Sequence, residues 1–352
     1  MSPKISLSVY TFSHFCVDFA CFYILFSGIA SGAPSSEIVA IAFLLYNAIA
    51  FGLQPILGYV CDEKPKLPAA VIGCITVLCG FVLLFNAWAA LVISAVGNAW
   101  FHIGGGVDSL VGAKGKMSRS GVFVSLGALG VVLGTLAGKN AINVCVPIGL
   151  MVVSLFFTLL VFRHYPERLG KKQTSFSIGS SISPVSLVII LCFISIMIRS
   201  YAGSIVPIDW RTTDFLFVLP AVGACVGKAA GGFIADVVGA RKTGTITLLA
   251  SVPFIVFGYS FPLTCLIGVL LFNMSMSITL CAVATKLPRN PGLAFGLTTL
   301  GLLCGNTLTF FFAPARQTAL FLIGTLVVIS AGCIYFALLH SKGGLGNEKT
   351  VY

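Results

Sequence analysis

The chain has 352 residues, of which 58% are hydrophobic and only 9% are charged. A soluble globular protein carries roughly 25% charged residues, so this composition excludes a soluble enzyme. The formal net charge of +11 could indicate a nucleic-acid binder, but Lys and Arg occur in short clusters between long apolar runs. That placement is typical of an integral membrane protein, and we expect no nucleic-acid partner.

Breaks in the apolar runs predict twelve membrane-spanning helices, each of which needs about 20 residues. The predicted spans are 6–30, 37–60, 67–86, 88–112, 120–138, 141–162, 184–206, 213–236, 243–260, 262–285, 293–313 and 317–340. We therefore expect an all-α membrane protein whose short connections leave no room for a soluble domain.

The basic residues test this count, because Lys and Arg concentrate in cytoplasmic loops. Twelve spans place most of them on one side of the membrane: Lys4, Lys64, Lys66, Lys114, Lys116, Arg119, Arg163, Arg168, Lys171, Lys172, Arg241, Lys242, Lys286, Arg289, Lys342 and Lys349. The other side receives only Lys139, Arg211 and Arg316. This asymmetry predicts a multi-pass protein of the plasma (inner) membrane with both termini in the cytoplasm.

The longest connection, 164–183, lies at the middle of the chain and mixes Arg, Lys, Ser and Gly. We expect it to be a cytoplasmic linker between two six-helix halves. The N-terminal half would cover 1–163, and the C-terminal half, with a short cytoplasmic tail, would cover 184–352.

Two patterns repeat between these halves. Gly58 and Asp62 end the second span as Gly232 and Asp236 end the eighth, 174 residues later. The fifth and eleventh spans share glycines spaced nine and four residues apart: Gly121, Gly130 and Gly134 in one, and Gly292, Gly301 and Gly305 in the other. Duplicated halves around a midplane site are the architecture of many secondary transporters.

The eighth span ends in a motif that resembles the cytoplasmic signature of the major facilitator superfamily. Its residues are Gly232, Asp236, Gly239, Arg241 and Lys242, and the copy is complete. The first copy keeps Gly58 and Asp62 but has Pro65 and Leu67 where the family has Gly and Arg. The resemblance implies two pseudo-symmetric six-helix bundles that alternate between inward-open and outward-open states, usually as a monomer.

The fifth span resembles the antiporter signature of that superfamily through Gly121, Gly130, Gly134 and Gly138. Thr135 stands in place of the usual proline, and Lys139 in place of a final glycine. Three shorter motifs are similar to the fosmidomycin-resistance branch: Ser13-His14-Phe15-Cys16-Val17-Asp18, Phe101-His102 and Arg199-Ser200. Ile103-Gly104 stand where that branch has Pro-Glu. The branch resemblance implies drug-resistance efflux in exchange for protons.

Ionisable side chains within spans are the first functional candidates, since they are costly to insert. His14 and Asp18 are four residues apart and share one helix face, where a carboxylate beside an imidazole can bind and release a proton. The alternative is a static pair that locks the helix. His102 is a candidate for lining the cavity or for packing. Asp108 is a proton-coupling candidate or forms a salt bridge between helices.

Two cations within spans have competing interpretations. Arg199 carries a rigid fork that suits a carboxylate or phosphonate, so it either binds an anionic substrate or neutralises Asp18. We expect Lys228 to extend along its helix to the cytoplasmic surface.

The aspartates of the repeated motif are expected to form a gate. The resemblance implies that Asp62 and Asp236 hold the cytoplasmic side shut, and Asp236 lies near Arg241 and Lys242 in sequence, which would make a breakable latch. The glycines of the fifth and eleventh spans would let helices approach closely.

The predicted function is secondary active transport, most simply the proton-coupled efflux of a small amphiphilic or anionic compound. An uptake symporter or a uniporter for an organic anion stays open, and a non-transporting membrane receptor is a more remote alternative. No nucleophile and base occur at a recognisable spacing, so we expect no enzymatic activity. The four histidines, His14, His102, His164 and His340, and the twelve cysteines lack zinc-site spacing, so we expect no metal and no cofactor.

Overall fold

The computed structural model describes residues 3–33, 35–164 and 184–339, and the expected linker therefore lies almost entirely outside the described residues. The N-terminal half contains α1 (Pro3–Ile24), η1 (Leu25–Ala30), α2 (Ser36–Gly52), α3 (Gln54–Glu63), α4 (Ala69–Val82), α5 (Ala87–Gly112), α6 (Met117–Ser125), α7 (Gly127–Lys139) and α8 (Cys145–His164). The C-terminal half contains α10 (Val185–Ser204), α11 (Asp214–Val238), α12 (Ala240–Val256), α13 (Pro262–Asn273), α14 (Met276–Lys286), α15 (Pro291–Phe311) and α16 (Arg316–Ala337).

These helices form the twelve expected spans. Four spans are interrupted: η1 continues α1 as a π-helix, and α2–α3, α6–α7 and α13–α14 are each a single span with a break. In the described part of the chain, ten helical stretches have at least 18 residues and are apolar enough to cross a membrane. The other two spans are the shorter α4, with 14 residues, and α12, with 17. The chain is an all-α membrane protein.

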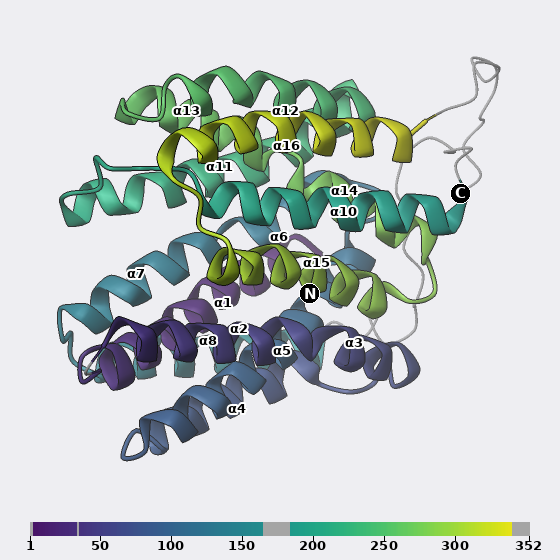
Figure 1. Ribbon diagram of the computed structural model, residues 1–352. Coiled ribbons are helices and arrows are strands. Elements are labelled where there is room, and N and C mark those ends of the chain that lie inside the picture. Colours follow the sequence, from purple (N-terminus) through teal and green to yellow (C-terminus); the bar gives the residue numbers. More distant parts are fainter. Residues whose placement is uncertain (1–2, 34, 165–183, 340–352) are drawn as a thin grey trace.

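The two halves lie against each other as two bundles. In Figure 1, helices up to α8 form the lower part and α10 to α14 and α16 form the upper part, with α15 between them. Contacts between the halves join α6 to α11 and α3 to α15. In the twelve-span numbering these pairs are spans 5 and 8 and spans 2 and 11, so the interface has the same pseudo-symmetry as the repeated motifs.

The breaks follow local chemistry. Pro55 lies in the first turn of α3, where its missing N–H costs no hydrogen bond within that helix, and Leu53 separates α2 from α3. Gly239 has φ +98° and reverses the chain between α11 and α12 in one residue. The sequence placed a longer loop here. Because Gly239 makes the turn alone, α12 begins at Ala240, and Arg241 and Lys242 lie in its first turn.

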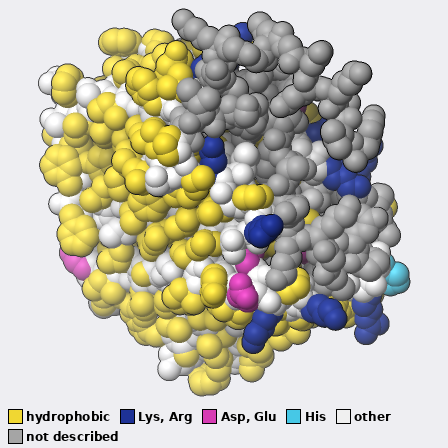
Figure 2. All heavy atoms as spheres, turned by 90° about the vertical axis from the view of Figure 1, so that its right-hand side faces the viewer, with side chains coloured by type: hydrophobic (Ala, Val, Ile, Leu, Met, Phe, Trp, Pro, Cys, Tyr) yellow, Lys and Arg dark blue, Asp and Glu magenta, His cyan; other side chains and the backbone are white. Residues whose placement is uncertain are grey.

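One end of the molecule carries Asp62, near the end of α3, and Asp236, near the end of α11. We call it the aspartate end. The end of α3 lies on the right of Figure 1. Figure 2 views the molecule from that side and shows Lys and Arg side chains beside a broad hydrophobic flank. Basic residues at a helix end next to an apolar belt are the pattern of a membrane–water boundary.

Candidate functional site

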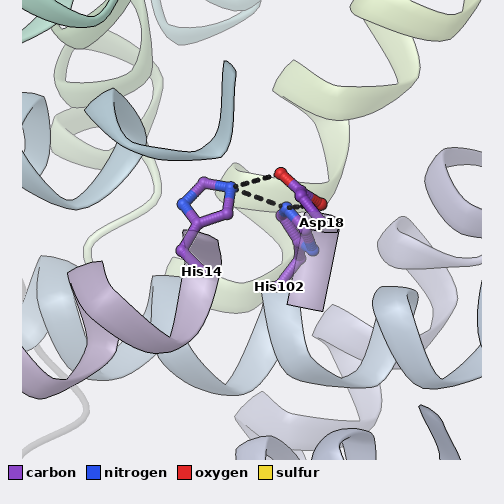
Figure 3. A group of neighbouring side chains, drawn as sticks. All are labelled: His14, Asp18 and His102. Carbon is purple, nitrogen blue, oxygen red and sulfur yellow. Dashed lines mark hydrogen bonds and ion pairs between the residues drawn. The ribbon is translucent and has the colours of Figure 1, made fainter. Parts of the chain in front are cut away.

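Two histidines and a carboxylate meet in the interior of the N-terminal half. His14 and Asp18 lie one turn apart on α1, with His14 Nε2 3.3 Å from Asp18 Oδ2. His102 comes from α5, and its Nε2 lies 3.7 Å from Asp18 Oδ1 and 2.9 Å from His14 Nε2. All three side chains are buried. Figure 3 shows them pointing toward one another, and we call them the His–Asp–His cluster.

Backbone carbonyls fix the tautomer of both imidazole rings. His14 Nδ1 lies 2.8 Å from the carbonyl oxygen of Phe123, and His102 Nδ1 lies 2.9 Å from that of Asn98. Because a carbonyl oxygen only accepts, each Nδ1 carries a proton and donates it. Two neutral rings would then direct lone pairs at each other across 2.9 Å. A further proton between the two Nε2 atoms would relieve that repulsion.

Asp18 balances such a shared proton. Its carboxylate accepts a hydrogen bond of 2.9 Å from Asn98 Nδ2 in addition to its contacts with the imidazoles. A buried imidazolium needs a nearby counter-charge, and this carboxylate is in contact with both rings. The cluster can therefore hold one proton among three side chains and release it when its surroundings change. Asn98 was not among the sequence candidates, although its position four residues before His102 places it on the same helix face.

Gly127 leaves the space that the cluster occupies. A Cβ at this position would lie 2.4 Å from His14 Nε2 and 2.6 Å from Asp18 Oδ2. It lies at the start of α7, immediately after the break at Leu126. Gly127 carries no signal in the sequence, because it falls outside the repeated glycine spacing.

A central cavity of about 190 Å³ lies between the halves and includes the cluster in its wall. The N-terminal half contributes His14, Asp18 and His102, and the C-terminal half contributes Lys228, Thr279, Thr298 and Thr299. The remaining wall is apolar apart from Gly127: Phe51, Val124, Ala128, Val131, Ile196, Met276, Leu280, Phe295 and Leu302. A mostly apolar pocket with a few converging polar groups is the usual form of a small-molecule site.

Lys228 departs from its expected position. We predicted that its side chain would extend to the membrane surface, and this is wrong, because the half-buried residue lines the central cavity. Its backbone packs against α6, where a Cβ on Gly121 would lie 2.6 Å from the Lys228 carbonyl oxygen. This contact holds the residue at the interface of the halves.

Arg199 lies behind the cavity wall and not in it. Its Nη1 donates to Ser275 Oγ and its Nη2 donates to Thr279 Oγ1, both at 2.9 Å. These partners flank the start of α14, beside the break in the α13–α14 span. The fork therefore holds a cavity-lining hydroxyl in place, and within the described residues it forms no ion pair with Asp18.

The repeated aspartates bind helix N-termini in the opposite half. Asp62 accepts from the backbone N–H groups of Gly292 and Leu293, at 2.8 and 2.9 Å, at the start of α15. Asp236 accepts from those of Met117 and Ser118, at 2.7 and 3.0 Å, at the start of α6. A carboxylate at a helix N-terminus satisfies orphan donors and complements the helix dipole.

The basic residues of the motif do not pair with Asp236. Instead, the guanidinium of Arg241 lies over the ring of Tyr335, 5.3 Å from its centroid, and Lys242 is exposed. The contact on this side is therefore made by a carboxylate and backbone amides, because Gly239 starts α12 early and Arg241 packs on Tyr335 of α16.

Close glycine contacts add to this contact between the halves. A Cβ on Gly58 would lie 2.2 Å from the Gly292 carbonyl oxygen, and one on Gly232 would lie 2.7 Å from that of Met117. The halves thus meet backbone to backbone at the aspartate end. The other predicted packing glycines also face neighbouring chain at less than 3.2 Å: Gly121, Gly130, Gly134, Gly138, Gly301 and Gly305.

Asp108 lies on α5, toward the aspartate end and away from the cluster. It accepts a hydrogen bond from the Tyr10 hydroxyl. It lines two small cavities, one of which also includes Asp62 and the other Arg119. The structure thus separates Asp108 from the central cavity.

The opposite end of the molecule is joined by side chains. The Lys139 amine lies over the rings of Phe26 and Phe217, 5.3 and 5.5 Å from their centroids. Next to it, Asn140 Nδ2 donates to Asp214 Oδ2 at 3.1 Å. Lys139 replaces the last glycine of the antiporter signature, and here it connects α7 to α11 of the other half.

The cluster also has the composition of a metal site, because its three ligand atoms lie within 4.8 Å of one another. The spacing of the imidazoles discriminates between a metal ion and a proton. Two imidazole nitrogens on one tetrahedral Zn²⁺, each about 2.0–2.1 Å from the ion, would be about 3.3 Å apart. The observed 2.9 Å is a hydrogen-bond length and fits a proton better.

Comparison with known proteins identifies the fold through solved structures, whereas the sequence comparisons find no match. No family model matches the chain, and no curated protein matches it in sequence. Solved structures match over nearly their whole length. The fucose:proton symporter FucP of E. coli has a TM-score of 0.66 at 11% identity, with 96% of this chain and 99% of that chain covered.

Two further structures agree. The human organic anion transporter MFSD10 has a TM-score of 0.66 at 13% identity, covering 95% of this chain and 100% of that one. A bacterial homologue of the iron transporter ferroportin in an outward-facing state has a TM-score of 0.57 at 14% identity, with 96% and 97% covered. The chain therefore has the major facilitator fold, as the motifs indicated.

Proposed function

We propose that this protein is a secondary active transporter that moves a small amphiphilic or anionic compound by alternating access. The central cavity between two bundles supports this proposal, since it is a site that two moving halves can expose in turn. In this proposal the halves are 1–163 and 184–352, joined by 164–183. The protein lies in the plasma membrane as a monomer, and its aspartate end faces the cytoplasm.

Proton coupling is the second part of the proposal, and the His–Asp–His cluster carries it. The observation that carries it is the 2.9 Å separation of His14 Nε2 and His102 Nε2, a hydrogen-bond distance across which the two rings can share a proton. Both rings and Asp18 border the cavity, so a substrate that enters can change the stability of the shared proton. Release of a proton on substrate binding would couple the two in exchange transport. The proposed direction for the substrate is efflux.

Gating completes the proposed cycle. Asp62 and Asp236 would hold the cytoplasmic side shut through their helix N-termini and would release them when the halves rock apart. These bonds can break without leaving a buried charge, because carboxylates and amides at a membrane surface can both be hydrated.

The experiment uses purified protein in liposomes that contain a trapped pH dye. Fosmidomycin and benzenesulfonate serve as probes. We expect proton movement only when a transported compound is present, and no such movement in Asp18→Asn. The matched control is Asp209→Asn, which removes an exposed carboxylate paired with Arg316.

Each outcome has a meaning. The sign of the proton movement separates efflux by exchange from uptake by co-transport. Tracer flux without proton movement would mean a uniporter, and the cluster would then be structural. Absence of any flux for compounds that bind would favour a receptor and overturn the transport proposal.

A further inference from the structure

Lys228 stands on the cavity wall that belongs to the C-terminal half. It lines the same cavity as Asp18 and His102. No described residue forms a hydrogen bond or an ion pair with it. A cationic side chain within a membrane span is costly to keep and is usually paired or functional.

The charges around the cavity do not cancel. The carboxylate of Asp18 already contacts both imidazoles and Asn98, and in the proposed coupling the shared proton offsets its charge. Arg199 adds a second cation behind Thr279, and its two bonds go to neutral hydroxyls. The described lining of the C-terminal half contains no carboxylate. The wall of this half is therefore positive.

We propose that Lys228 is the anion-binding group of the central cavity and that the ligand is a compact organic monoanion with an apolar body. The inference rests on the proposed function in that it takes this cavity as the substrate site. The anionic head contacts the ammonium beside the hydroxyls of Thr279, Thr298 and Thr299. The apolar body lies against the hydrophobic lining, and the volume of about 190 Å³ limits its size.

This arrangement assigns different roles to the two cations. Arg199 is a positioning residue, since its fork holds Ser275 and Thr279 and it is buried outside the cavity lining. Lys228 has three donors on a flexible stem and no partner among the described residues. A point charge of this kind accepts carboxylate, sulfonate or phosphonate heads without demanding bidentate geometry.

The first test measures equilibrium binding to the purified full-length chain by calorimetry. The probes are benzenesulfonate and phenylphosphonate, with benzenesulfonamide as the neutral isostere and phenyltrimethylammonium as the cation. We expect an anion to bind and both isosteres to bind at least about tenfold more weakly, the size of one charge-assisted hydrogen bond. Lys228→Gln should lose this preference, and Lys228→Arg should restore part of it. Lys4→Gln, at an exposed lysine, is the control.

Binding of the sulfonamide or of the cation as tightly as the anions would overturn the proposal. So would the failure of both anions to bind, or unchanged anion binding in Lys228→Gln.

The second test needs no ligand and separates a binding lysine from a structural one. In the proposal, the Lys228 ammonium has no anionic partner in the ligand-free protein. Lys228→Met then removes a charge without removing an ion pair, so the thermal midpoint of the ligand-free protein should rise. A fall in the midpoint would show that Lys228 stabilises the fold through its charge, and would overturn the proposal. Lys4→Met is the control.

These tests are independent of the liposome experiment. Anion binding without flux would contradict the proposed transport function and support the anion site. Proton-coupled flux of neutral or cationic compounds alone would support transport and contradict the anion site.

Discussion

Asp62 and Asp236, 174 residues apart, bind the N-termini of α15 and α6 with the same two-bond geometry, and each reaches into the opposite half. The internal repeat is therefore a repeat of contacts as well as of residues. Each carboxylate satisfies two backbone donors that the helix itself leaves free. Both carboxylates therefore join the two halves at the aspartate end.

Asp236→Ala should loosen the contact between α11 and α6. Two hydrogen bonds to a charged acceptor are lost, and such a bond contributes about 1.5–3 kcal/mol. We expect faster hydrogen exchange at the amides of Met117 and Ser118, by about tenfold or more, with little change at Gly292 and Leu293. Asp62→Ala should show the mirror-image result. Unchanged exchange at the α6 amides would mean that other contacts hold this end shut.

The close approach of α3 and α15 should make Gly292 intolerant of any side chain. A Cβ there would lie 2.3 Å from the Gly58 carbonyl oxygen, so Gly292→Ala forces the helices apart at a cost of about 1–3 kcal/mol. We expect a lower thermal midpoint. Gly332→Ala in α16 is the matched control, because nothing lies within 4 Å of its Cβ position. That variant should gain about 0.5–1 kcal/mol from helix propensity, and an equal loss in both would refute the packing explanation.

Gly127→Ala should disable the His–Asp–His cluster without removing any of its members. The new methyl group would displace His14 and Asp18, because it would stand 2.4 Å and 2.6 Å from them. Proton movement in liposomes should fall to the level of Asp18→Asn, while the protein still folds. Gly149→Ala, whose Cβ position is open, serves as the control. Wild-type proton movement in Gly127→Ala would show that the cluster geometry does not matter for coupling.

Arg199→Lys should destabilise the protein more than it weakens anion binding. A lysine can replace only one of the bonds to Ser275 and Thr279, so we expect a loss of about 1–2 kcal/mol in unfolding free energy. Binding of benzenesulfonate should weaken less than in Lys228→Gln. If the order of the two variants is reversed in the binding measurement, Arg199 contacts the ligand directly.

Metal removal gives a further check on the cluster. If the cluster holds a proton and not a metal ion, treating the purified protein with EDTA should leave the proton-coupled flux and the thermal midpoint unchanged. Loss of flux that added Zn²⁺ restores would instead assign the cluster to a metal, which its composition permits.

Hydropathy and the repeated motifs were enough to predict the architecture of this protein. Hydropathy sets each span locally, because lipid forces every apolar run of sufficient length to satisfy its own backbone as a helix. The repeat of Gly58 and Asp62 in Gly232 and Asp236 indicated the duplicated halves. The spacing of His14 and Asp18 also placed them on one helix face, since the α-helix repeats every 3.6 residues.

The meeting of residues from different spans depended instead on how the helices pack. The contact of His102 with His14 joins residues 88 positions apart, and no periodicity in either helix encodes it. The partners of Asp62 and Asp236 are backbone amides, which any sequence supplies, so residue type gave no signal. Lys228 could reach either the membrane surface or the cavity along its own helix, and the packing of α11 against α6 at Gly121 selected the cavity.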